Sequence, residues 1–185
     1  IIEIFKMWSD FDSQTNYVIK NAWRLLSFQD KEISSPSYGS FHYAYWRDKT
    51  SEFADARFQE AGATIGILST NKYAKFHGKT LPSKDELYIT FSAALENLAN
   101  IQYKDGSFDE WYKGERGFAA TEFTSIAFGL AAICIGDELK IKERQLLNNI
   151  LFKSGKWLSN REDKIKSNHQ AAAAAALSII WKLTN

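Results

Sequence analysis

The spacing of apolar residues along the chain predicts a succession of helices. Apolar side chains recur every three or four residues, whereas long runs that alternate apolar and polar residues, as half-buried strands do, are absent. Serine, glycine, proline and asparagine interrupt this spacing and divide the chain into predicted helices over residues 14–29, 53–68, 83–103, 118–135, 137–153 and 168–183. Residues 1–8 are predicted to form a separate short helix or the tail of a longer element. The fold class is therefore predicted to be all-α.

The predicted helices alternate between two kinds. Residues 14–29, 83–103 and 137–153 carry a charged face, whereas residues 54–69, 118–135 and 168–183 are small or apolar all round. A helix that is apolar all round is typically buried, and an amphipathic helix faces water on one side. The alternation predicts an inner and an outer layer of helices.

The joins between the two kinds of helix repeat along the chain. Segments 23–29 and 96–102 both end an outer helix in a hydrophobic residue and Gln, and Gly, Ser and Phe follow at 39–41 and 106–108. An aromatic, charged loop then leads into an inner helix, in which Glu60 of the first copy aligns with Glu122 of the second. A third, shorter copy covers 157–161 and 168–171.

Repeated helix pairs of this kind bury their apolar faces by stacking on their neighbours. If the pairs lie side by side, all three loops and the N-termini of all three inner helices meet at one end of the molecule. Helix N-termini carry partial positive charge and free N–H groups, so this end is expected to favour anionic ligands.

The repeated segments also carry a family resemblance. Leu98, Gln102 and the run 105–108 resemble the repeat motif of the terpenoid-cyclase and prenyltransferase α/α toroids. A fuller pattern resembles bacterial and archaeal proteins of the α/α-toroid class that are found with polysaccharide genes and lie near the heparinase II/III and alginate-lyase toroids. Its segments are 38–41, 45–46, 53, 56–59, 105–112, 118–121 and 168–171.

The resemblance implies one α/α-toroid-like domain over residues 1–185, and it brings no settled reaction with it. Complete toroids are considerably longer, so we expect a partial ring: an open arc of six or seven helices, a fragment, or half of a dimer. The exposed faces of an arc favour self-association.

Composition narrows the classes of function. The net charge of +1 argues against a nucleic-acid-binding protein, because such proteins usually carry a basic surplus. Cys134 is the only cysteine and lies in an apolar run, which predicts a buried core thiol and excludes an intrachain disulfide. No metal-ligand spacing is present, and we expect no metal and no cofactor. No signal peptide and no apolar run of roughly 20 residues is apparent, so we expect no membrane span and a cytoplasmic location.

The loop 105–116 concentrates acidic and aromatic residues and supplies the first candidates for catalysis. Glu110 as one of a pair of carboxylates suits acid–base work on a glycoside, and Tyr112 suits proton transfer on a uronate. The alternative is structural: Asp105 and Gly106 form a turn, and the remaining acids cap a helix or form surface ion pairs.

His169 is the third candidate for catalysis. An Asn–His pair and a Tyr act in the lyase-type toroids, so the resemblance implies a catalytic role for His169. In that reading Arg47, Arg116 and Asn168 hold the substrate carboxylate. Alternatively, a histidine at a helix start is a cap or a packing residue.

Further residues are predicted to bind the substrate. Tyr45, Trp46 and Trp111 suit stacking on sugar rings, or else cover the core beneath the loops. Glu60 and Glu122 begin two inner helices and are expected to converge with Tyr112 and His169 in one cleft.

Together these features predict a carbohydrate-active protein that acts on or binds an anionic polysaccharide, as a lyase, epimerase or hydrolase. One alternative is a non-catalytic binding or scaffold module in polysaccharide biosynthesis. Another is an isoprenoid-handling toroid, although the Asp-rich motifs of terpene cyclases are missing.

Overall fold

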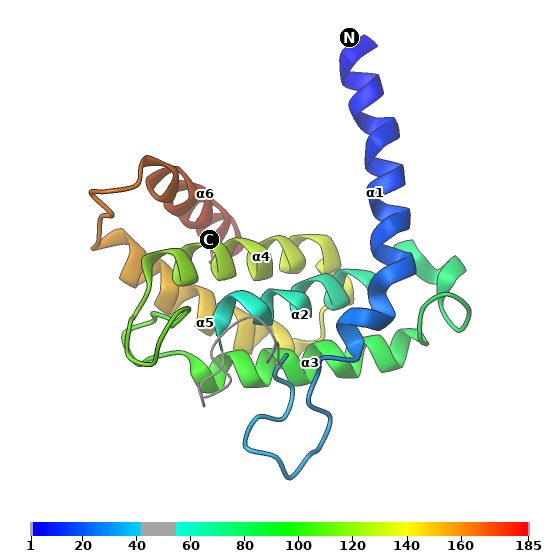
Figure 1. The fold of residues 1–185 in the computed structure, drawn as a ribbon, viewed down its shortest axis with the longest axis horizontal. Helices are drawn as coiled ribbons and strands as arrows, with labels where there is room; N and C mark the ends of the chain where they lie inside the picture. Colours follow the sequence, from blue (N-terminus) through cyan, green and yellow to red (C-terminus); the bar gives the residue numbers. More distant parts are fainter. Residues whose placement is uncertain (1, 42–54, 185) are drawn as a thin grey trace.

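The computed structural model describes residues 2–41 and 55–184, with side chains described from residue 14 on. Within these ranges the chain is helical, which confirms the all-α class, and β-structure is limited to isolated bridges. The helices are α1 (Ile2–Leu26), α2 (Ala56–Leu68), α3 (Lys84–Ile101), α4 (Phe118–Ile135), α5 (Ile141–Ser159) and α6 (Ser167–Thr184) (Figure 1). Two short 3-10 helices, η1 (Asn71–Phe76) and η2 (Gly136–Glu138), join them.

Two predicted helix boundaries are confirmed together with their causes. Ser83 accepts a hydrogen bond from the backbone N–H of Glu86, and the Glu86 carboxylate accepts one from the backbone of Ser83, so a complete capping box begins α3. Gly136, with φ +56°, ends α4.

Of the two alternatives for residues 1–8, the tail of a longer element holds, because Ile2–Leu26 form one continuous helix. Another boundary was predicted wrongly: α5 runs through Ser154 and Gly155, where a break was predicted. Gly155 serves close packing instead: a Cβ at this position would lie 3.2 Å from Cγ2 of Ile180 in α6. The glycine therefore allows two helices to approach each other.

The helices pack in two layers. α4 packs between α2 and α6 in one layer, and α5 contacts α3, α4 and α6. α6 is buried along one face only, at Ala173, Ala176 and Ile180, so the prediction of a buried inner helix was wrong for α6. One large core cluster joins α3, α4 and α5, with Phe91, Phe128 and Leu151 fully buried in it. The first half of α1 extends away from the other helices (Figure 1).

The internal repeat is visible in the hydrogen bonds of its glutamines. The side-chain amide of Gln29 donates to the carbonyl of Gly39 (3.2 Å) and to a carbonyl of α3 (2.8 Å). The side-chain amide of Gln102 likewise donates to the carbonyl of Gly106 (3.1 Å) and to a carbonyl of α5 (3.0 Å). In both copies one amide ties the loop to the next outer helix.

A second pair of hydrogen bonds fixes the register of the two copies. The Phe41 N–H donates to Oε1 of Gln59 (2.8 Å), and the Phe108 N–H donates to Oγ1 of Thr121 (3.1 Å). Gln59 and Thr121 are aligned in the sequence comparison, so these contacts confirm the alignment. The glutamates one position further along consequently occupy equivalent places.

Gly39 and Gly106 allow the backbone of each loop to meet the neighbouring outer helix. Both have positive φ, +83° and +99°. A Cβ on Gly39 would collide with the carbonyl of Ala93, and a Cβ on Gly106 with that of Lys153. Both the backbone conformation and the contact therefore require glycine.

The thiol of Cys134 is exposed, so the prediction of a buried core thiol was wrong. Its neighbours Leu130 and Ile133 are also exposed, to 44% and 37%. Because α4 is apolar all round, its pattern does not show which side its neighbours cover. Among the described residues one segment, Phe118–Glu138, is long and apolar enough to cross a bilayer, but 56% of it is buried inside the fold, as in an ordinary core helix.

We expect Gly106→Ala to lower the free energy of unfolding by about 2 kcal/mol or more, because the new Cβ adds a backbone collision to an unfavourable φ. Gly114→Ala is the matched control: its φ is +86°, but no atom lies within 4 Å of the new Cβ. That variant should lose only about 1 kcal/mol. Urea denaturation measures both, and equal losses would contradict the role of the close contact.

Candidate functional site

Charged side chains from all three inner helices meet near the starts of those helices. Arg57 and Glu60 lie in the first two turns of α2, Glu122 lies in the second turn of α4, and His169 lies in the first turn of α6. Asp163 joins them from the loop that precedes α6. We call these five residues the acid–base cluster.

His169 is held by Asp163. Its Nδ1 lies 2.7 Å from Oδ2 of Asp163, while the other carboxylate oxygen accepts the backbone N–H groups of Ile165 (2.9 Å) and Lys166 (3.2 Å). The backbone hydrogen bond from Ile165 lowers the pKa of Asp163, and the weaker effect of the hydrogen bond from His169 lowers it further. An ionised Asp163 favours the proton on Nδ1 of His169, which leaves the lone pair on Nε2. Nε2 makes no hydrogen bond with any described residue.

Glu122 is fully buried, and neither of its carboxylate oxygens has a hydrogen-bond partner among the described residues. Burial raises the pKa of Glu122 to about 7; the negative charge of Asp163 adds to this effect, and Arg57 opposes it. A buried carboxyl without a partner disfavours ionisation, so Glu122 holds its proton up to neutral pH.

Glu60 has the same property at the equivalent place in the first copy. Burial raises its pKa to about 7, Arg57 opposes the rise, and Glu110 and Asp55 reinforce it. The Nε of Arg57 lies 3.0 Å from Oε1 of Glu60, but this oxygen receives no well-directed hydrogen bond. The side chains of Arg57 and Glu60 remain 32% and 26% exposed, so both are open to solvent.

Phe123 joins the two halves of the acid–base cluster. The guanidinium carbon of Arg57 lies 4.2 Å from the centre of the Phe123 ring, and the ring of His169 meets the same side chain edge-on at 6.3 Å between centroids. The face of an aromatic ring attracts a cation. Phe123 therefore contacts both Arg57 and His169.

The loop 105–116 uses most of its carboxylates to hold its own shape. Oδ1 of Asp109 accepts the Arg116 N–H (2.8 Å), and Oδ2 accepts the Tyr103 hydroxyl (2.6 Å) and the Gly114 N–H (2.7 Å). Oε2 of Glu115 accepts two backbone N–H groups of the loop, at 2.8 and 3.0 Å. Both residues therefore have a structural role, but they bind backbone N–H groups of the loop and neither caps a helix nor forms an ion pair with a described residue.

Arg116 and Asp105 belong to the same framework. Nη1 of Arg116 donates to Oδ2 of Asp105 at 2.8 Å, and its guanidinium lies over the ring of Tyr103. The other Asp105 oxygen accepts the N–H and hydroxyl of Ser107 (3.1 and 2.6 Å). Arg116 thus stabilises the turn that Asp105 begins.

The other predicted residues divide into three groups. Trp111 and Tyr112 are 61% and 63% exposed at the tip of the loop, and Asn168 is exposed at the start of α6. Glu110 is half-buried and acts on the cluster through its charge, which raises the pKa of Glu60. Tyr45, Trp46 and Arg47 lie outside the described residues.

Glu60 is connected to Glu122 and His169 only through Arg57, Phe123 and Asp163, so the predicted convergence of these three residues in one cleft stays a prediction. Arg57 and Asp163 were not predicted as site residues. Arg57 lies three residues before Glu60 on one helix, a spacing at which side chains meet. Asp163 falls in a polar loop six residues before His169, and no local pattern marks it as the partner of the histidine.

Among the described residues, no group of three or more His, Cys, Asp or Glu side chains is arranged to hold a metal ion. The chain matches no family model, no curated protein and no solved structure. The resemblance to the α/α toroids therefore stays a prediction.

The raised pKa of Glu122 makes stability depend on pH. Its folded pKa, about 7, lies above the ordinary 4.5. Its contribution to stability is therefore complete below pH 4.5 and is lost as pH rises through 7. We expect Glu122→Gln to reduce this loss, so that the melting temperature falls less between pH 5 and pH 8 than in the wild type.

Thermal melts across that range measure the difference. The control is Glu162→Gln, which removes an exposed carboxylate from the loop before α6 and should leave the wild-type profile unchanged. Identical pH profiles for Glu122→Gln and the wild type would contradict a raised pKa.

Proposed function

We propose that this protein is a carbohydrate-active enzyme that cleaves an anionic, uronate-containing polysaccharide by acid–base chemistry of the lyase type. The observation that carries the proposal is the acid–base cluster: equivalent glutamates with raised pKa lie around Arg57 and beside the His169–Asp163 pair. Clusters of groups with perturbed pKa values are typical of active sites.

We also propose that the two layers form an open arc of the α/α-toroid kind. The order of contacts α2–α4–α6 in the inner layer and the repeated loop contacts support this arrangement. In such an arc α6 ends the inner layer, in keeping with the exposed Ala171, Ala174 and Ala175 along it. Self-association through such an end face stays a prediction.

In the proposed reaction His169 is the base. Its Nδ1 side is held by Asp163, so Nε2 is the nitrogen that takes a proton from substrate. The hydrogen on C5 of a uronate lies next to the carboxylate carbon and becomes acidic when the charge of that carboxylate is neutralised. Arg57, partly exposed and fixed over Phe123, is the cation that neutralises it.

Glu60 is the acid. Its raised pKa keeps it protonated near neutral pH, and a quarter of its side chain is exposed. The C5–H proton passes to Nε2 of His169, the C4=C5 double bond forms, and the C4–O bond breaks. The leaving oxygen takes the proton of Glu60, and solvent water then returns the proton from His169 to Glu60. Glu122 is buried near these groups, and its protonation state changes the net charge around Arg57.

The substrate class rests on the family resemblance and on the cationic group at the site. The non-catalytic binding module is the alternative in which the same residues hold the glycan without turnover. The isoprenoid alternative needs an enclosed apolar cavity, whereas the groove beside α5 and the groove beside α3 are both open at the surface.

We expect His169→Ala and Glu60→Gln each to lower kcat on a polyuronate by about 10²- to 10⁴-fold, the usual contribution of a general base or acid. Turnover is followed through the ultraviolet absorbance of the unsaturated product. Glu96→Gln, on the outer helix α3, is the control and should retain wild-type kcat.

Tyr112→Phe separates the two candidate acids. If Glu60 is the acid, this variant retains turnover, because Tyr112 lies at the exposed loop tip. Full activity of His169→Ala would disprove the mechanism. Saturated reducing ends in place of unsaturated products would identify a hydrolase, and binding without turnover would identify the non-catalytic module.

A further inference from the structure

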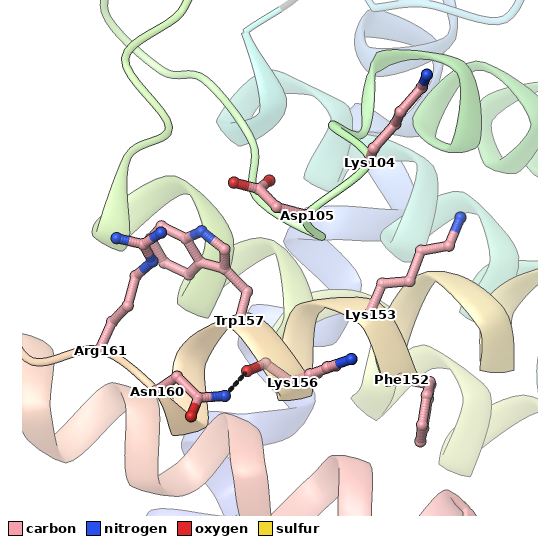
Figure 2. A pocket seen from close by; sticks show the side chains of 8 residues that line it. All are labelled: Lys104, Asp105, Phe152, Lys153, Lys156, Trp157, Asn160 and Arg161. Carbon is pink, nitrogen blue, oxygen red and sulfur yellow. Dashed lines mark hydrogen bonds between the residues drawn. The ribbon is translucent and has the colours of Figure 1, made fainter.

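A groove of about 600 Å³ lies outside the acid–base cluster, between the start of the loop 105–116 and the C-terminal half of α5 (Figure 2). Its volume is in the range of ordinary small-ligand sites. Eight residues line it: Lys104, Asp105, Phe152, Lys153, Lys156, Trp157, Asn160 and Arg161.

The groove carries a local excess of positive charge in a protein whose net charge is only +1. Four cations line it, Lys104, Lys153, Lys156 and Arg161, and none forms an ion pair with a described residue. The one acidic lining residue, Asp105, is already neutralised by Arg116 at 2.8 Å. The lining residues therefore supply four cations and no unpaired acid.

Trp157 adds a hydrogen-bond donor without an acceptor. The residue is 6% exposed, and its Nε1–H has no partner among the described residues. The guanidinium of Arg161 lies over its ring, 4.6 Å from the centre, and the indole nitrogen is on the ring edge toward Asp105 (Figure 2). A buried N–H without an acceptor is unfavourable, so an oxygen atom supplied by a ligand would complete the site.

The first copy of the repeat shows that these features do not follow from the architecture. The loop glycines contact Ala93 of α3 and Lys153 of α5, so Lys156, Trp157 and Arg161 correspond to Glu96, Asn97 and Ile101 of α3. A second groove, of about 350 Å³, lies in the first copy against the N-terminal half of α3; its lining is largely apolar and its charged residues, Lys31 and Glu86, have opposite signs. Trp23, which lines this second groove, donates its Nε1–H to the carbonyl of Thr80 at 2.6 Å. The cations and the orphan indole N–H are specific to the second copy.

We propose that this groove binds an acidic sugar unit of the polysaccharide, with the oxygens of its carboxylate or sulfate group meeting the Trp157 N–H and the lysine ammonium groups. This proposal rests on the proposed function, to which it adds a binding subsite beyond the reacting sugar. A nucleic-acid ligand is disfavoured, because the net charge of the chain is only +1 and nucleic-acid-binding proteins usually carry a basic surplus.

The test is calorimetric titration of the intact protein with a trigalacturonate, a sulfated trisaccharide and the corresponding neutral trisaccharide. We expect the acidic sugars to bind, to weaken with added salt, and to bind about tenfold less tightly to Lys104→Glu/Lys156→Glu, which corresponds to about 1.4 kcal/mol. Both lysines are exposed, so the double variant should fold normally. Lys31→Glu, in the groove of the first copy, is the matched control and should bind like the wild type.

A second readout locates the ligand. The indole N–H resonance of Trp157, assigned with Trp157→Phe, should shift during titration with the acidic sugar, and that of Trp23 should not. Equal affinity for the neutral sugar, unchanged binding by the lysine double variant, or a static Trp157 resonance would each overturn the proposal. Equal affinity for inorganic phosphate would reveal a general anion site. Stronger binding of single-stranded RNA would identify a nucleic-acid ligand. Either result would overturn the proposal of an acidic-sugar subsite.

The test of the groove can be distinguished from the test of the proposed enzyme activity. His169→Ala should still bind the acidic trisaccharide at the groove while losing turnover. Turnover by the wild type with an unchanged KM in Lys104→Glu/Lys156→Glu would disprove the groove alone. Binding at the groove with no turnover of any acidic polymer would disprove the enzyme alone.

Discussion

The structure depends on one contact that occurs twice: a loop glycine lies directly on the backbone of the next outer helix, and a buried glutamine amide bridges the two. Gln29 with Gly39 makes this contact onto α3, and Gln102 with Gly106 makes it onto α5. Each amide pairs the carbonyl of a loop glycine, a group that is costly to leave unpaired when buried, and adds a second hydrogen bond to a carbonyl inside the next outer helix. The contact sets the spacing between neighbouring helix pairs. It therefore also fixes where the inner helix after each loop begins.

The position of the acid–base cluster is a consequence of that spacing. The hydrogen bonds from Phe41 and Phe108 to the inner helices place Glu60 and Glu122 at equivalent positions of the repeat, and burial raises the pKa of both. The depths differ, because Glu122 is fully buried and the Glu60 side chain is partly exposed. Arg57 acts on both glutamates, whereas Glu110 acts on Glu60 and Asp163 acts on Glu122.

The sequence allowed the layers, most helices and the alignment of the repeat to be predicted, because these depend on local spacing and on glycine, serine and glutamine at fixed places. It did not predict that α5 continues through Gly155, since the reason is a side chain of α6. Nor did it predict Arg57 and Asp163 as members of the cluster, because their roles arise only when three helix ends meet. The sequence left open whether Asp109 and Glu115 have a chemical or a structural role, because their partners are backbone N–H groups of the folded loop.

The exposed thiol of Cys134 has a practical consequence. It is the only cysteine in the chain, so a maleimide or spin label attaches at one defined place without any mutation. Cys134 and Glu122 lie on the same helix twelve residues apart, and at the rise of an α-helix this separates them by about 18 Å along the axis. A reporter at Cys134 is thus far enough away to leave the acid–base cluster undisturbed and close enough to sense a ligand that moves α4.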